Sequence, residues 1–195
     1  DGGIETDLTV VCMDKHFFRI VSSAATREHD KYHILKYLDK DVEFSDVTEE
    51  FCCLGLFGPK SREMISKICK DDFSNENFKF GTGKFINIFD SNTPWGKPKE
   101  IKVWVQRLSY VGEIGFELYV DSSSAKDLYE ILIEEGKKFE LSHCGMHAMD
   151  IMRMESGFVH WGHDISPEEN QYQAGLNFAI SYKKNVNFIG KDALL

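Results

Sequence analysis

Residues 108–118, LSYVGEIGFEL, contain the clearest turn between two strands in this sequence. The apolar and β-branched runs on either side predict strands over 102–108 and 116–120. Glycines flank the turn itself, which carries Tyr110 and Glu113. A tyrosine and an acid on such a turn are candidates for binding a ligand, although a turn acid with no ligand would produce the same local pattern.

Strand and helix signals alternate along the rest of the chain. β-branched and aromatic runs predict strands, and apolar residues three or four apart predict helices. Strand pairs followed by a helix occur more than once, which predicts an α+β fold with antiparallel sheets. The predicted strands are 7–13, 17–22, 42–45, 52–57, 84–89, 102–108 and 116–120, and the predicted helices are 27–38, one opened by Gly58-Pro59, one started by Ser124 and 145–155.

Local signals specify details of three of these helices. Thr26 is a candidate cap for the first helix, whose apolar stripe would consist of Ile34, Leu35 and Leu38. Ser124 and Asp127 have the spacing of a capping box. Residues 71–83 carry little periodicity and predict a long loop.

Composition limits the classes of function. With 195 residues, 42% of them hydrophobic, the chain can bury the core of one large domain or two small lobes. It has no apolar run of the roughly 20 residues that cross a membrane. The net charge of -9 comes without a dense basic cluster. We therefore expect a small-molecule partner, and neither nucleic acid nor membrane.

Two further observations concern the context of the chain. Its five cysteines are odd in number and lack redox or zinc spacing, which is typical of free thiols in a reducing compartment. The expected location is therefore the cytoplasm, or the mitochondrial matrix in a eukaryote. The chain starts at Asp1 and stops at Leu195 without a polar tail. We expect both ends to be cuts in a longer polypeptide.

Two other segments carry candidate chemistry. DGGIETDLTV, residues 1–10, places Asp7 after two glycines, at the start of a strand. MRMESG, residues 152–157, carries Arg153 and ends a helix against a glycine. Gly81-Thr82-Gly83-Lys84 lacks the spacing of a phosphate loop. The histidines lack carboxylates at metal-ligand spacing, so no metal is predicted.

These segments resemble the aminomethyltransferase family, the T-protein of glycine cleavage. Five of its motifs occur in family order across nearly the whole chain: the glycine-rich start, the YxGExGxEL turn, the RxExG helix end, the WGxDI stretch and the terminal FIGKxAL. Details such as GIETDLTV and SNENFKFGT look closer to the folate-binding halves of sarcosine and dimethylglycine dehydrogenases. In those enzymes a separate flavin domain oxidises the amine.

The resemblance implies an α+β folate-binding fold containing ferredoxin-like units. Residues 1–195 would be the folate-binding domain of an aminomethyltransferase, incomplete at both ends, in one piece or two lobes. The implied activity is tetrahydrofolate-dependent transfer of an aminomethyl or methylene group. The parent is either a flavin-containing fusion, in which FAD sits in another domain, or a free T-protein served by a lipoyl carrier protein. A non-catalytic folate-binding module in regulation or iron–sulfur assembly is the alternative.

Four residues take roles from this resemblance. Glu113 would accept the paired N–H donors of the pterin, because a carboxylate accepts two parallel hydrogen bonds. Tyr110 would line the pocket or hydrogen-bond the cofactor, and Arg153 would hold a glutamate in place or meet the charged folate tail. Asp7 would be the catalytic acid, stabilising positive charge on the transferred carbon or accepting a proton.

The sequence departs from the family pattern at two places. Thr6-Asp7 stands where T-proteins often have paired acids, so the catalytic role passes only to Asp7. Asn170–Leu176, NQYQAGL, stands where relatives read TPxEAGL. The role of that proline and glutamate is therefore in doubt here.

Overall fold

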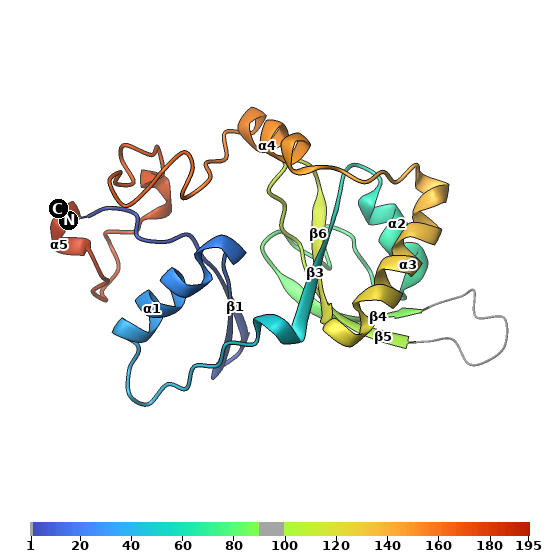
Figure 1. The fold of residues 1–195 in the computed structure, drawn as a ribbon, viewed down its shortest axis with the longest axis horizontal. Helices are drawn as coiled ribbons and strands as arrows, with labels where there is room; N and C mark the ends of the chain where they lie inside the picture. The colour runs from blue at the N-terminus through green and yellow to red at the C-terminus, as the bar shows by residue number, and fades with distance from the viewer. Residues whose placement is uncertain (1, 90–99) are drawn as a thin grey trace. The chain divides into compact units, whose positions relative to one another are not determined.

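The computed structural model describes residues 2–89 and 100–195, so Asp1 lies outside the described residues (Figure 1). The chain divides into two compact units. The discontinuous unit consists of residues up to Phe44 together with Phe158–Leu195, and the continuous unit is Ser45–Gly157. None of the described helices has both the length and the apolar character needed to cross a bilayer.

The continuous unit is built on a four-stranded antiparallel sheet. Its strands are β3 (Phe51–Phe57), β4 (Gly83–Phe89), β5 (Glu100–Gln106) and β6 (Gly115–Asp121), in the spatial order β3-β6-β5-β4. Leu54 of β3 lies opposite Leu118 of β6. Helices α2 (Ser61–Ile68) and α3 (Ala125–Gly136) run side by side against the sheet (Figure 1). A further helix, α4 (Met146–Glu155), ends this unit.

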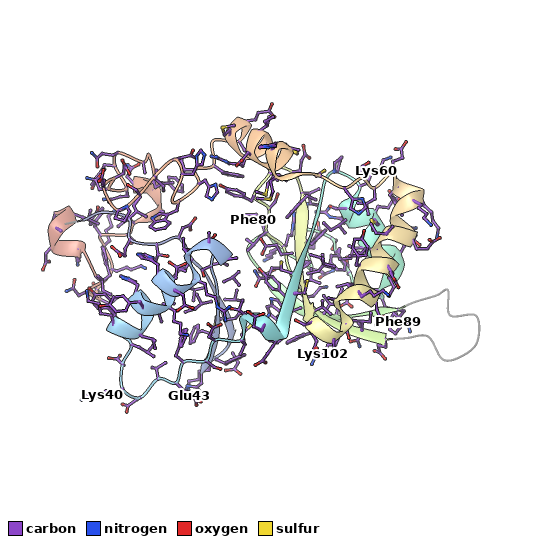
Figure 2. All side chains as sticks on the ribbon, viewed as in Figure 1. Lys40, Glu43, Lys60, Phe80, Phe89 and Lys102 are labelled. Carbon is purple, nitrogen blue, oxygen red and sulfur yellow. The ribbon has the colours of Figure 1, made fainter. Side chains whose placement is uncertain are left out.

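The core lies between the sheet and these two helices, where side chains fill the space (Figure 2). Side chains alternate between the two faces of a strand, so Phe116, Leu118 and Val120 of β6 all point into this core and are almost completely buried. Phe73 and Phe78 from the loop before β4 pack around Phe116, with ring centroids 5.1 and 5.9 Å away. The loop predicted over residues 71–83 thus contributes two side chains to the core.

The discontinuous unit joins two distant parts of the sequence. Its regular elements are the antiparallel hairpin of β1 (Thr9–Asp14) and β2 (Phe17–Val21), α1 (Arg27–Tyr37) and the short α5 (Lys191–Leu194). Gly3 pairs with Asn170, and the Ile4 amide donates to the Glu169 carbonyl over 2.9 Å. The chain also forms short 3₁₀ helices at Ala24–Thr26, Thr48–Glu50, Ser122–Ser124, Lys137–Phe139 and Asn177–Ala179.

The predicted α+β class with antiparallel sheets is confirmed, and so are six of the seven predicted strands, with small shifts of boundary. The strand predicted over 42–45 is wrong. The Val42 amide donates to the Asp39 carbonyl in a turn, and Val42 is 52% exposed. An apolar β-branched residue favours a strand only when a neighbouring strand is present to pair with it.

The predicted helix starts need correction. Helix α2 begins at Ser61, two residues after Pro59. Neither Thr26 nor Ser124 caps its α-helix through a side-chain hydrogen bond. Thr26 donates instead to the Asp30 carboxylate, and the Asp121 carboxylate accepts the Ser123 amide at the 3₁₀ turn before α3.

The apolar stripe predicted for α1 is confirmed only in part, since Ile34 and Leu38 are half-buried. Leu35, which belongs to the predicted apolar stripe, is 48% exposed. Asp30 is the only residue of α1 that is almost completely buried. A buried acid must find hydrogen-bond donors, so α1 is held through polar contacts as well as apolar ones.

Candidate functional site

The turn between β5 and β6 is fixed at its end by the beginning of α2. The Ile114 carbonyl accepts hydrogen bonds from the Gly58 amide, over 2.8 Å, and from the Ser61 hydroxyl, over 3.3 Å. Tyr110 is half-buried in this turn and Glu113 is exposed. The predicted location of both residues in a turn between strands is therefore confirmed.

Gly112 brings this turn against the end of α4. Its φ is 73°, and a Cβ added there would lie 1.9 Å from the Ser156 hydroxyl. Arg153 of α4 is only 2% exposed, and its Nε donates to Asp150 Oδ1 over 3.2 Å. Two of the segments singled out in the sequence thus meet in the continuous unit. Arg153 thus pairs with an aspartate one turn earlier in its own helix, and its burial leaves little of it exposed to solvent.

Substitution of Gly112 tests this contact. Gly112→Ala and Gly81→Ala both place a side chain at φ 73°, which costs about 1 kcal/mol of unfolding free energy. No heavy atom lies within 4 Å of the Cβ position at Gly81, whereas at Gly112 the Ser156 hydroxyl must leave its hydrogen bond to the Met152 carbonyl. We expect Gly112→Ala to cost about 1 kcal/mol more than Gly81→Ala in chemical denaturation. Equal losses of unfolding free energy in the two variants would show that the contact between Gly112 and Ser156 does not affect stability.

The sheet face opposite the apolar core carries a carboxylate that the sequence analysis did not select. Glu117 alternates with Phe116 and Leu118 along β6, so it points away from the helices, and it is half-buried. The Tyr119 hydroxyl donates to its Oε2 over 2.6 Å, and the Gln106 amide approaches the same oxygen at 3.5 Å. Among the described residues, Oε1 of Glu117 has no hydrogen-bond partner. One oxygen is therefore fixed and the other is open.

The neighbours of Glu117 combine hydrogen-bonding groups with flat rings. Burial raises the pKa of the Tyr119 phenol above its usual range, and the hydrogen bond to Glu117 adds to this shift, so the phenol remains a donor. Gln106, 2% exposed, accepts the Trp104 indole N–H over 3.0 Å. Phe85 meets the Trp104 ring edge-on at 4.9 Å. Such a face can bind a planar, nitrogen-rich ring.

In the discontinuous unit, the glycine-rich segment lies beside a hollow of about 600 Å³. Gly2, Gly3 and Thr6 line it, together with residues of α1 and of the C-terminal part of the unit. A Cβ on Gly3 would lie 1.8 Å from the Pro167 carbonyl oxygen. The requirement for glycine at position 3 thus comes from close packing within the chain.

Asp7 follows this segment and is exposed, two residues before β1. Among the described residues, its carboxylate makes no hydrogen bond or ion pair. An acid at the entrance of a strand can also serve as a turn cap, but the contacts of Asp7 give no support to that role. Asp7 belongs to the discontinuous unit, and Tyr110, Glu113 and Arg153 belong to the continuous unit.

The segment NQYQAGL, residues 170–176, departs from the family pattern but still forms the hydrogen bonds of a capped turn. The Asn170 side-chain oxygen accepts the amides of Tyr172 and Gln173, over 3.0 and 3.1 Å. The Gln173 side chain accepts the Asn170 amide in return, over 2.9 Å. Asparagine and glutamine thus form the reciprocal pair of a capping box, so the turn needs neither a proline nor a glutamate.

Comparison with known proteins identifies the class. The family model described as the GCVT N-terminal domain matches residues 1–184. The formaldehyde-forming 4-methylaminobutanoate oxidase of Paenarthrobacter nicotinovorans is 36% identical over 99% of this chain and 22% of its own length. Mitochondrial dimethylglycine dehydrogenase of Mus musculus is 31% identical over 99% of this chain and 21% of its own length. The aminomethyltransferase of Oceanobacillus iheyensis is 34% identical over the whole chain and 51% of its own length.

The chain therefore belongs to the T-protein family, as a GCVT N-terminal domain. It spans about a fifth of the two oxidative relatives and about half of the aminomethyltransferase. The heterotetrameric sarcosine oxidase of Corynebacterium sp. U-96 has a similar fold, with a TM-score of 0.53 and 16% identity over 74% of this chain and 66% of that one.

Proposed function

We propose that this chain is the folate-binding part of a tetrahydrofolate-dependent one-carbon transferase. Membership of the T-protein family over residues 1–184 carries the proposal. The relatives named as a formaldehyde-forming oxidase and as dimethylglycine dehydrogenase act on amines, which favours a parent that oxidises a methylamine in a separate flavin domain. A free aminomethyltransferase with a lipoyl carrier protein is the other form of the same proposal. The compartment is the cytoplasm, or the matrix in a eukaryote.

The face around Glu117 fits the pterin of tetrahydrofolate. A pterin presents a ring N–H and an amino group side by side, and a carboxylate is the natural acceptor for that pair. Glu117 is half-buried and one of its oxygens is held by Tyr119, so less freedom is lost on binding than at the exposed Glu113. We therefore propose Glu117 as the pterin anchor, and Glu113 with Tyr110 as the next candidates, on the adjoining turn.

Asp7 is the proposed catalytic acid. When bound, tetrahydrofolate supplies the nitrogens that receive the one-carbon unit. Because the Asp7 carboxylate is exposed and has no partner among the described residues, it is available to stabilise positive charge or to accept a proton at its oxygens. For Arg153 we propose a supporting role within α4, where it is buried and its Nε donates to Asp150 one turn earlier, close to the end of the helix that meets the binding turn at Gly112.

Two measurements on the full-length protein test this function. Calorimetry with 5-formyltetrahydrofolate, a stable reduced folate, should detect binding. Turnover with dimethylglycine, sarcosine or an aminomethyl-lipoyl carrier protein should yield 5,10-methylenetetrahydrofolate. Folate binding without product from any of these donors would favour the non-catalytic module, and an absence of binding would refute both.

A further inference from the structure

Asp30 is an acid that the proposed chemistry leaves unused. It projects from α1, is 2% exposed and accepts several side-chain hydrogen bonds. Thr6 Oγ1 donates to Oδ1 over 2.5 Å, Thr26 Oγ1 donates to Oδ2 over 2.6 Å, and His29 Nδ1 lies 3.1 Å from Oδ1. A buried carboxylate with several donors strongly resists displacement, because every lost donor leaves a buried charge less satisfied.

These contacts converge on the residues just before Asp7. His29 Nε2 lies 3.1 Å from a carboxylate oxygen of Glu5, and the His29 ring packs on Trp161 at 5.4 Å. The Trp161 indole N–H donates to the Ile4 carbonyl over 2.7 Å. Three consecutive residues, 4–6, are therefore each held by a side chain from another part of the discontinuous unit.

Asp7 itself has no comparable support. Its side chain is exposed and without a partner among the described residues, and it lies outside any regular element. Its direction must therefore come from the backbone that precedes it. Orientation matters in catalysis, since a misplacement of about 1 Å at a reacting group can reduce a rate about 100-fold.

We propose that Asp30 is a positioning residue that fixes Thr6 through its hydroxyl and thereby directs the Asp7 carboxylate. This inference rests on the proposed function, in which Asp7 is catalytic. Asp30 touches neither folate nor the transferred carbon in this scheme. It acts only through Thr6.

Two threonines that donate to the same acid provide a matched test. Thr6→Val and Thr26→Val each remove one hydroxyl from Asp30 and keep the shape of the side chain, but only Thr6 adjoins Asp7. In the full-length protein, we expect both to lower the melting temperature similarly. Only Thr6→Val should lower kcat for transfer, about tenfold, with KM for tetrahydrofolate within twofold. Thr6→Ser, which restores the hydroxyl, should recover most of kcat.

The outcomes separate the two proposals. Equal kcat for Thr6→Val and Thr26→Val, with Asp7→Asn still impaired, would overturn the positioning role and leave the proposed function standing. Normal transfer by Asp7→Asn would instead refute the catalytic assignment on which the inference rests. If Thr6→Val fails to fold, Thr6→Ala removes the same donor without a buried methyl facing Asp30, and the same comparison of kcat applies.

Discussion

Asp7→Asn is expected to lower one-carbon transfer to tetrahydrofolate about 100-fold or more, which is the scale of one lost electrostatic or acid–base contribution. Asparagine has nearly the same size as aspartate and still accepts hydrogen bonds. It carries no charge to stabilise a cation and cannot take up a proton. Because the Asp7 carboxylate has no partner among the described residues, folate affinity and thermal stability should change little.

The measurement is the ratio of formaldehyde to 5,10-methylenetetrahydrofolate at saturating folate. In a parent with a flavin domain, amine oxidation should continue in Asp7→Asn and release formaldehyde. Asp14→Asn makes the same change at another exposed acid of the discontinuous unit, at the end of β1 next to the hairpin turn, and should leave the ratio unchanged. An unchanged ratio in folded Asp7→Asn would move the catalytic role to Glu5 or to Asp1.

Glu117→Gln is expected to weaken binding of 5-formyltetrahydrofolate by about 3 kcal/mol, or roughly 100-fold. The amide has one acceptor oxygen in place of two, and its NH₂ group would face the donors of the pterin. It would also lose the charge that strengthens both hydrogen bonds. Tyr119→Phe should have a smaller effect, since it removes only the donor that holds Oε2.

Glu113→Gln is the matched comparison for Glu117→Gln. The two acids lie four residues apart, one exposed on the turn and one half-buried on the sheet. If Glu113 bound the pterin as the sequence predicts, its replacement would cost about 1 to 3 kcal/mol by calorimetry. A loss of folate affinity confined to Glu113→Gln would show that Glu117 has only a structural role in the sheet and that the sequence-based assignment to Glu113 is correct.

The continuous unit was the more predictable part of the fold. Strands β4, β5 and β6 alternate apolar and polar residues, and that pattern specifies both the strand and its buried face. The prediction errors occur where tertiary contacts, and not local sequence, determine the conformation. Val42 has a strand-like side chain in a turn, and Thr26 has the right position for a cap but donates to Asp30.

The residues of the candidate site were likewise predictable only in part. The glycines that flank the turn pointed to Tyr110 and Glu113, because glycine marks a backbone requirement that is visible in sequence. Glu117 lies in the same motif and was missed, although alternation along β6 places it opposite the apolar core. Asp30 left no usable signal, since a helical acid normally faces solvent and its burial depends on Thr6, far away in sequence.

The pairing of Gly3 with Asn170 has a consequence for the order of folding. All contacts within the continuous unit come from one uninterrupted stretch, so that unit can form as soon as Gly157 has been synthesised. The strand-like pairing in the discontinuous unit cannot form until residues 158–195 have been synthesised. It joins two parts of the chain that are separated in sequence by the whole continuous unit. A chain collapsed over 45–157 brings the two flanks together at a lower entropic cost than an unstructured loop of that length. The segment that presents Asp7 is therefore among the last parts of the molecule to reach its native conformation.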